Sequence, residues 1–101
     1  MTKLWTWSGK FFGYRDGDNL WTYTGNHIGK LKGDIVFDKT GMYIGEIKSE
    51  KRLIFHMSHI NRTLSPFSPH PRRATISRYS DYPGYAMYAG YKDFDYKKYL
   101  E

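Results

Sequence analysis

Hydrophobic and polar positions recur along the first half of the chain with a period of sixteen residues. Three copies of this unit follow one another without a gap, over residues 4–19, 20–35 and 36–51. Each copy opens with an aliphatic residue followed by an aromatic one, and two glycines follow at fixed places: Gly9 and Gly13, Gly25 and Gly29, Gly41 and Gly45. A fixed period is typical of small units that bury their apolar faces only against one another.

Each unit predicts a β-hairpin. A short polar residue three positions before the first glycine, as in Thr6 and Gly9, is typical of a type I turn that ends in a glycine with positive φ. The predicted register has two faces: Leu4–Phe12, Leu20–Ile28 and Val36–Ile44 pair on one, and Trp5–Phe11, Trp21–His27 and Phe37–Tyr43 pair on the other. We expect the aliphatic pairs to form the core of an antiparallel meander that extends to about residue 57.

A degenerate fourth unit occupies residues 52–63. Leu53 and Ile54 match the opening pair after one inserted residue, but no glycine stands near Ser58 where the turn is due. The second strand of this hairpin is therefore expected either from residues 85–91 or from a second copy of the chain, because an unpaired sheet edge favours association.

The C-terminal extension, residues 64–101, has a different composition. Pro66, Pro69 and Pro71 are spaced too closely for a helix or a central strand and predict an extended connector. Residues 72–78 are a candidate short strand, and residues 93–101 a candidate terminal helix that is stable only if docked. The whole chain of 101 residues is of a size for one domain.

Composition supports a strand-rich protein and indicates the cellular compartment in which it works. Aromatic residues make up 19% of the chain, including ten tyrosines, and there is no cysteine for a disulfide or a thiolate metal site. The net charge is +6, and most of the excess lies in the second half. No stretch has the pattern of a signal peptide or a membrane span, so we expect a cytoplasmic protein without membrane contact.

The tandem units resemble a small bacterial domain, the four-fold β-flower, in which hairpin repeats surround a central pseudo-axis. The resemblance covers roughly residues 3–57 and rests on periodic glycine and hydrophobic positions. It implies an all-β, four-petalled fold of tandem hairpin repeats and implies no activity. The glycine missing near Ser58 is where this chain departs from the pattern.

Two aromatic side chains are candidate contact residues. Trp7 and Tyr23 fall on central turn positions of their hairpins, where a side chain tends to point into solvent. Exposed aromatic residues mark contact surfaces. The alternative is that the C-terminal half packs over these turns, because a small domain can rarely leave its aromatic residues uncovered.

A second candidate surface combines cations with flat rings, the two ingredients of single-stranded nucleic-acid binding. The cations are His70, Arg72, Arg73 and Arg78, and the rings are Tyr79, Tyr82 and Tyr85. The alternative is a solvated basic loop beside structural tyrosines, and no RNA-binding signature is present.

Metal binding and catalysis receive little support from the sequence. His56 and His59 are three residues apart, which suits a helical turn, but the local pattern is extended and would put them on opposite faces of a strand. His27 takes the place of an aromatic residue and is better explained as a half-buried ring. We expect no metal, no cofactor and no catalytic residues, because no convergent set of titratable groups is evident.

The sequence therefore favours a non-enzymatic interaction domain that contacts a protein partner or itself, with homo-oligomerisation through the incomplete fourth unit. The alternative function is nucleic-acid binding through the basic, tyrosine-rich C-terminal surface.

Overall fold

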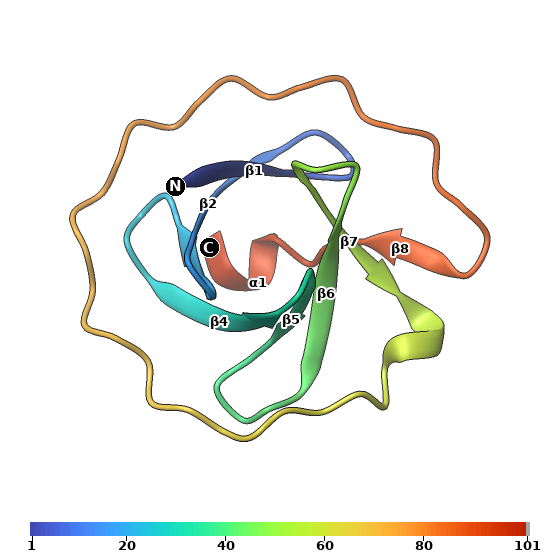
Figure 1. Cartoon of the computed structure of the whole chain (residues 1–101). Coiled ribbons are helices and arrows are strands. Elements are labelled where there is room, and N and C mark those ends of the chain that lie inside the picture. The colour runs from blue at the N-terminus through green and yellow to red at the C-terminus, as the bar shows by residue number, and fades with distance from the viewer. Residues whose placement is uncertain (101) are drawn as a thin grey trace.

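The computed structural model describes residues 1–100 and confirms an all-β protein with one small terminal helix (Figure 1). Its strands are β1 (Thr2–Thr6), β2 (Phe11–Asp16), β3 (Asn19–Thr22), β4 (His27–Lys32), β5 (Ile35–Phe37), β6 (Tyr43–Lys48), β7 (Arg52–His56) and β8 (Tyr91–Asp93). A 3₁₀ turn, η1 (Met57–His59), follows β7, and the helix α1 (Lys97–Leu100) comes near the end. Of the helix predicted over 93–101, α1 begins only at Lys97 and Asp93 belongs to β8, while the last residue of that range lies outside the described residues.

Strands β1 to β7 form an antiparallel meander that closes into a seven-stranded barrel. The closing pair, β7 with β1, is parallel and sets Trp5 opposite Arg52. With an odd number of alternating strands the first and last run in the same direction, so this pair has to be parallel. Its hydrogen bonds run from the Trp5 N–H to the Lys51 carbonyl (2.8 Å) and from the Trp7 N–H to the Leu53 carbonyl (2.9 Å).

The second strand beside β7 comes from the C-terminal part of the same chain. β8 pairs antiparallel with the far end of β7, where Ile54 lies opposite Asp93. β7 is thus bonded to β6 along one edge and to β1 and β8 along the other. The unpaired β7 edge, which suggested association with a second copy, is therefore occupied within the chain.

The hairpins β1–β2, β3–β4 and β5–β6 have equivalent turns. In each, the glycine N–H donates to the carbonyl of the polar residue three positions earlier: Gly9 to Thr6 (2.9 Å), Gly25 to Thr22 (3.0 Å) and Gly41 to Asp38 (2.9 Å). The glycine φ angles are 100°, 96° and 90°, which confirms the expected positive φ at the end of the turn.

The predicted register is confirmed for the aromatic face and wrong for the aliphatic one. Trp5 lies opposite Phe11, and the equivalent pairs in the next two hairpins are also formed. Leu4, however, lies opposite Gly13 and not Phe12, because a bulge shifts the register between Leu4 and Trp5. The bulge gives the second strand one extra residue, so Leu4 and Phe12 both reach the interior without being direct partners.

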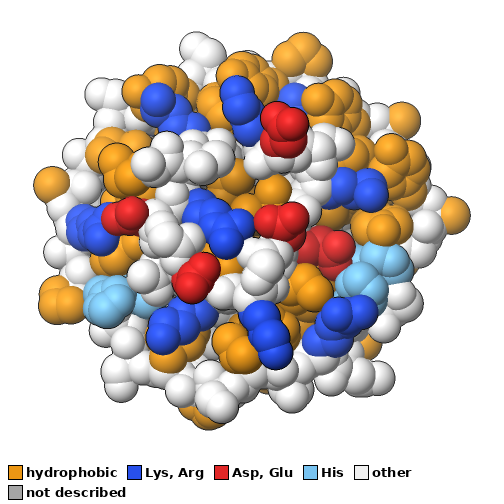
Figure 2. All heavy atoms as spheres, viewed as in Figure 1, with side chains coloured by type: hydrophobic (Ala, Val, Ile, Leu, Met, Phe, Trp, Pro, Cys, Tyr) orange, Lys and Arg blue, Asp and Glu red, His pale blue; other side chains and the backbone are white. Residues whose placement is uncertain are grey.

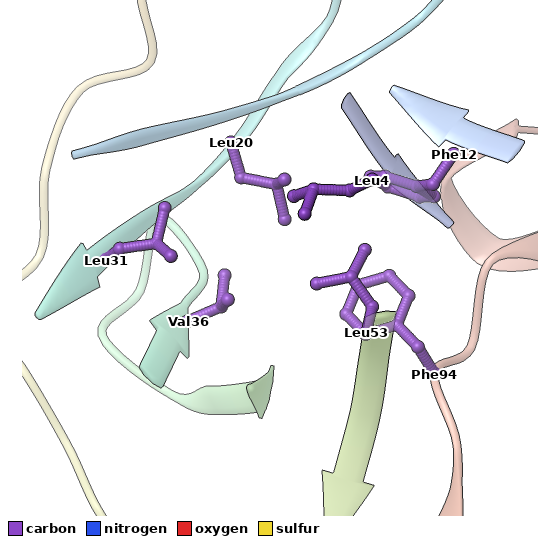
Figure 3. Close-up of a cluster of buried hydrophobic side chains, with 7 residues drawn as sticks. All are labelled: Leu4, Phe12, Leu20, Leu31, Val36, Leu53 and Phe94. Atoms are coloured by element: carbon purple, nitrogen blue, oxygen red, sulfur yellow. The ribbon is translucent and has the colours of Figure 1, made fainter. Parts of the chain in front are cut away.

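The barrel interior is a compact aliphatic and aromatic core (Figure 3). Its fully buried members are Leu4, Phe12, Leu20, Leu31, Val36, Leu53 and Phe94. Ile28 and Ile44, which were expected in this core, are partly buried at its margin. Helix α1 lies within the ring of strands, and the partly buried Tyr99 and Leu100 pack against the core (Figure 1).

Residues 64–90, which we call the belt, run around the outside of the strands as an open ring (Figure 1). The belt contains no strand, so the one expected over residues 72–78 is absent. Instead its amides bond to the hairpin turns one pair at a time. The N–H groups of Leu64, Arg73 and Tyr82 donate to the carbonyls of Gly41, Gly25 and Gly9, and those of Phe67, Ile76 and Tyr85 donate to the carbonyls of Lys39, Tyr23 and Trp7 (2.8–3.1 Å).

The bonded belt residues are nine positions apart in both series. Nine extended residues span roughly 30 Å. That is close to a quarter of the perimeter of a body measuring 37 Å by 33 Å across. The belt therefore advances by one hairpin for every nine residues.

Replacing a turn glycine should separate the effect of the belt contact from the effect of backbone conformation. A Cβ on Gly25 would collide with the Arg73 carbonyl oxygen, whereas a Cβ on Gly17, which also has positive φ (61°), would meet nothing within 4 Å. We expect Gly17→Ala to cost about 1 kcal/mol in the free energy of unfolding, and Gly25→Ala to cost at least about 3 kcal/mol because the belt has to move. Urea unfolding measures both variants, and equal losses would contradict the belt's role.

Candidate functional site

An aromatic layer covers the outer face of the strands, and the belt covers that layer. The ring of Tyr82 stacks on Trp5 with centroids 4.0 Å apart, and the Arg73 guanidinium lies 3.9 Å from the Trp21 ring centroid. His70 stacks on His27 at 4.9 Å. Several of the predicted site residues thus contact the protein's own rings.

Trp7 is not an exposed contact residue. Only 2% of its surface is accessible, because Tyr85 lies edge-on against it and its Nε1–H donates to the Ala86 carbonyl (3.0 Å). The alternative stated from the sequence, that the C-terminal half packs over the turns, describes this arrangement. Tyr23 is half-buried, and its ring lies 5.8 Å from that of Phe11.

The three arginines of the basic segment are exposed but already have partners within the chain. Arg73 pairs with Asp16 (2.9 Å), Arg78 pairs with Asp81 (2.9 Å), and the Arg72 Nε–H donates to the Thr24 carbonyl (3.2 Å). On the face seen in Figure 2, lysine and arginine side chains are scattered, with acidic side chains between them. Each of the three arginines is therefore already engaged by a group within the chain.

Four large apolar side chains remain exposed in the last part of the belt and in the turn after β7. We call Met57, Tyr85, Met87 and Tyr88, whose exposed fractions are 45–51%, the tyrosine–methionine patch. Met57 joins the belt residues because its N–H donates to the Gly90 carbonyl (2.9 Å). The sequence pointed to Tyr85 within a tyrosine-rich stretch, but Met57 joins it only through the fold.

Arg52 ties the closing strand to the belt, and no sequence motif marks this residue. It is 4% exposed, and its guanidinium donates to the carbonyls of Thr6 (3.3 Å), Trp7 (3.4 Å) and Pro83 (3.0 Å). The ring centroid of Tyr85 lies 4.1 Å away, close enough for a cation–π contact. Arg52 therefore holds the first hairpin turn and the last part of the belt together.

The buried His27 ring links a strand to the belt. Its Nδ1 accepts the His70 backbone N–H (2.9 Å), and its Nε2 lies 3.0 Å from the Gly29 carbonyl oxygen. Nε2 therefore carries the proton and the ring is neutral. Burial lowers the pKa of His27, and the nearby His70, Lys30 and Arg73 lower it further, against the opposing effect of the Gly29 hydrogen bond.

A second polar cluster brings His59 to Glu46. The Tyr43 hydroxyl donates to Glu46 Oε1 (2.7 Å), and His59 Nδ1 lies 2.7 Å from the same oxygen. Burial raises the pKa of Glu46, but the hydrogen bonds from Tyr43 and His59 outweigh it, so the net shift is downward.

The expectation that His56 and His59 lie on opposite faces of a strand is wrong. The η1 turn breaks the extended geometry, and the two rings stack with centroids 4.0 Å apart. Within residues 1–100, no group of three histidine or acidic side chains is arranged to hold a metal ion.

A pocket of about 520 Å³ opens beside the closing pair of strands, and we call it the seam pocket. Two lysines and three aromatic side chains are the part of its lining that bears on recognition: Lys3, Lys51, Trp5, Tyr79 and Tyr82. The sequence analysis grouped Tyr79 and Tyr82 with the arginines of the basic segment. In the fold, these two tyrosines line a pocket together with Lys3 and Lys51.

These features define a class of protein: a closed barrel of radiating β-hairpins enclosed by an extended outer belt. Residues 2–94 match the profile of the family described as "4-fold beta flower protein", and the chain belongs to this family. The match extends well beyond residue 57, where the resemblance in the repeats ends, and takes in the belt and β8. No curated protein and no solved structure matches the chain.

In the described part of the chain, no helix combines the length and the apolar character needed to cross a bilayer.

Acidification should weaken the fold through His27. Because its pKa in the folded state is lowered, the unfolded chain binds more protons between that pKa and the ordinary value of 6.5, so stability falls as the pH drops below 6.5. One such group contributes at most about 1.4 kcal/mol per pH unit. Urea unfolding at several pH values between 7.5 and 5 measures this slope.

The matched control is His27→Phe, which copies the aromatic residue Phe11 at the equivalent position of the first hairpin. In this variant the free energy of unfolding should depend less steeply on pH between pH 5 and 6.5. The carboxyls with lowered pKa values, such as Glu46, act at lower pH and do not interfere. An unchanged slope in His27→Phe would assign the effect to another histidine.

Proposed function

We propose that this chain is a non-catalytic interaction domain that makes protein–protein contacts, in the first instance with a second copy of itself. The observation that carries the proposal is the tyrosine–methionine patch. Tyrosine and methionine are enriched at protein interfaces, and an exposed cluster of large apolar side chains is costly unless something covers it. In Figure 2, hydrophobic side chains gather on the upper right rim, where Figure 1 shows the last part of the belt.

The neighbouring edge strand supports the same proposal. β8 is three residues long and pairs with β7, and within the described chain no strand pairs with its other edge. A short strand at the edge of a sheet, beside exposed apolar side chains, is a common place for contact with another chain. We therefore place self-association at β8 and the tyrosine–methionine patch, and not at the β7 edge, which β8 occupies.

The proposal includes a finer description of the fold. We interpret the three hairpins as equivalent sixteen-residue units and β7 with β8 as a fourth petal assembled from distant segments. Their identical turn hydrogen bonds support the equivalence. Leu53 supports the fourth petal, because it joins Leu4, Leu20 and Val36 in the core.

A non-catalytic role also fits the polar groups that the fold brings together. In the most concentrated cluster, one Glu46 oxygen receives both the Tyr43 and the His59 contacts, and the Tyr43 hydroxyl also accepts the His56 N–H (2.9 Å). These bonds satisfy the groups within the chain and hold β6 to the segment after β7. The hydrogen bonds of this cluster therefore support a structural role for these side chains.

Self-association is tested by light scattering coupled to size-exclusion chromatography over about 10 to 500 µM. We expect the mass to rise toward that of a dimer as concentration increases. Met57→Ser combined with Met87→Ser should raise the dimer dissociation constant at least tenfold, because polar serines replace two apolar side chains of the proposed interface.

The matched control is Met42→Ser combined with Ile60→Ser, since both are exposed apolar residues outside the patch (61% and 57%). This control variant should change the dimer dissociation constant by less than twofold. A wild-type chain that stays monomeric up to 500 µM, or equal weakening by both pairs, would overturn the proposed function.

A further inference from the structure

The seam pocket presents positive charge beside partly exposed aromatic rings. Tyr79 and Tyr82 are 42% and 41% exposed, and the Lys3 ammonium lies 4.5 Å from the Tyr79 ring centroid. Lys51 lines the same pocket from the turn that leads into β7. The floor is fixed in place, because Trp5 is buried and its Nε1–H donates to the Ser80 carbonyl (2.9 Å).

The charge of the pocket is unbalanced. Its lining contains two lysines and no acidic residue. Asp81, the acidic residue next to the lining, is already engaged: it accepts the Phe11 N–H (3.0 Å) and pairs with Lys10 and Arg78. Among residues 1–100, neither Lys3 nor Lys51 pairs with a carboxylate within 4 Å.

The seam between β2 and β3 offers a comparison, because there the chain itself supplies both a cation and an anion. There the belt residue is Arg73, which stacks on Trp21 and pairs with Asp16. At the closing seam the equivalent belt residue is Tyr82, which stacks on Trp5, and the neighbouring charges are lysines. The chain thus supplies its own cation and anion at one seam and leaves cations without an anion at the other.

We propose that the seam pocket binds a nucleobase that carries a phosphate group. The ligand is either a free nucleotide or one nucleotide of a single-stranded nucleic acid. Lys3 and Lys51 bind the phosphate, and the base stacks on the exposed rings of Tyr79 and Tyr82. A pocket of about 520 Å³ has the volume of a small-molecule site. This inference is independent of the proposed self-association, which uses a different part of the belt.

The test measures binding of two fluorescent probes, a labelled adenosine monophosphate and a labelled ten-nucleotide oligothymidylate, by anisotropy at 20 mM salt. Unlabelled inorganic phosphate and a DNA duplex serve as competitors. We expect at least one probe to bind, with phosphate and duplex competing poorly because neither offers an accessible base. Binding of the mononucleotide points to a free nucleotide as the source, and binding of the oligonucleotide alone points to a single strand.

The decisive variant is Lys3→Ala combined with Lys51→Ala. It should weaken binding at least tenfold and reduce the slope of log affinity against log salt for the oligonucleotide by about 0.7, the value for one lost phosphate contact. Tyr79→Leu should weaken binding at least fivefold at an unchanged salt slope, because it removes stacking and keeps the charge.

Two matched controls have the same loss of charge elsewhere. Lys39→Ala with Lys97→Ala and Arg62→Ala with Arg72→Ala, all exposed and outside the pocket, should each leave affinity within twofold. The proposal is overturned if neither probe binds to the wild-type chain, if the controls weaken binding as much as the lysine pair, or if duplex competes as well as single strand. Loss confined to the arginine variant would instead assign nucleic-acid binding to the basic segment.

Discussion

The backbone hydrogen bonds between the belt and the hairpin turns are the constraint on which the rest of this structure depends. Each hairpin has two apolar faces, and the barrel interior buries only one of them. The belt covers the other, yet it has no regular structure of its own in which to satisfy its amides. Six of its amides bond to the turns, where a carbonyl of the belt approaches so closely that only glycine fits. Turn glycines, belt spacing and aromatic layer are therefore one interdependent arrangement.

The surfaces proposed to bind ligands both lie beside β7, where the series of hairpins ends. Three hairpins are continuous in the chain, whereas β7 pairs with β8 across the whole length of the belt. At this junction the patch and the β8 edge are exposed. Further along the same edge of β7, beside the parallel pair of β7 with β1, lies the seam pocket.

Two polar side chains under the belt, Arg52 and His27, are tolerated because specific partners satisfy them. Arg52 is buried without a carboxylate, but three carbonyl oxygens and the Tyr85 ring surround its guanidinium. His27 occupies a position that holds Phe11 and Tyr43 in the other hairpins, and it adds a hydrogen bond to the belt. Such bonds fix the position of a segment that hydrophobic contact alone would leave free to slide.

The sequence by itself determined the strand class, the turn glycines, the aromatic pairs and the family, because these follow from local periodicity and turn chemistry. The tertiary structure decided the rest. Whether Trp7 is exposed depended on the belt, whose proline-rich and tyrosine-rich sequence has no period recognisable without its hydrogen-bond partners. Lys3 and Lys51 meet Tyr79 only because the barrel closes between the first and last strands of the meander. Contacts between segments so distant in the chain leave no local pattern, and that is where the candidate binding surfaces lie.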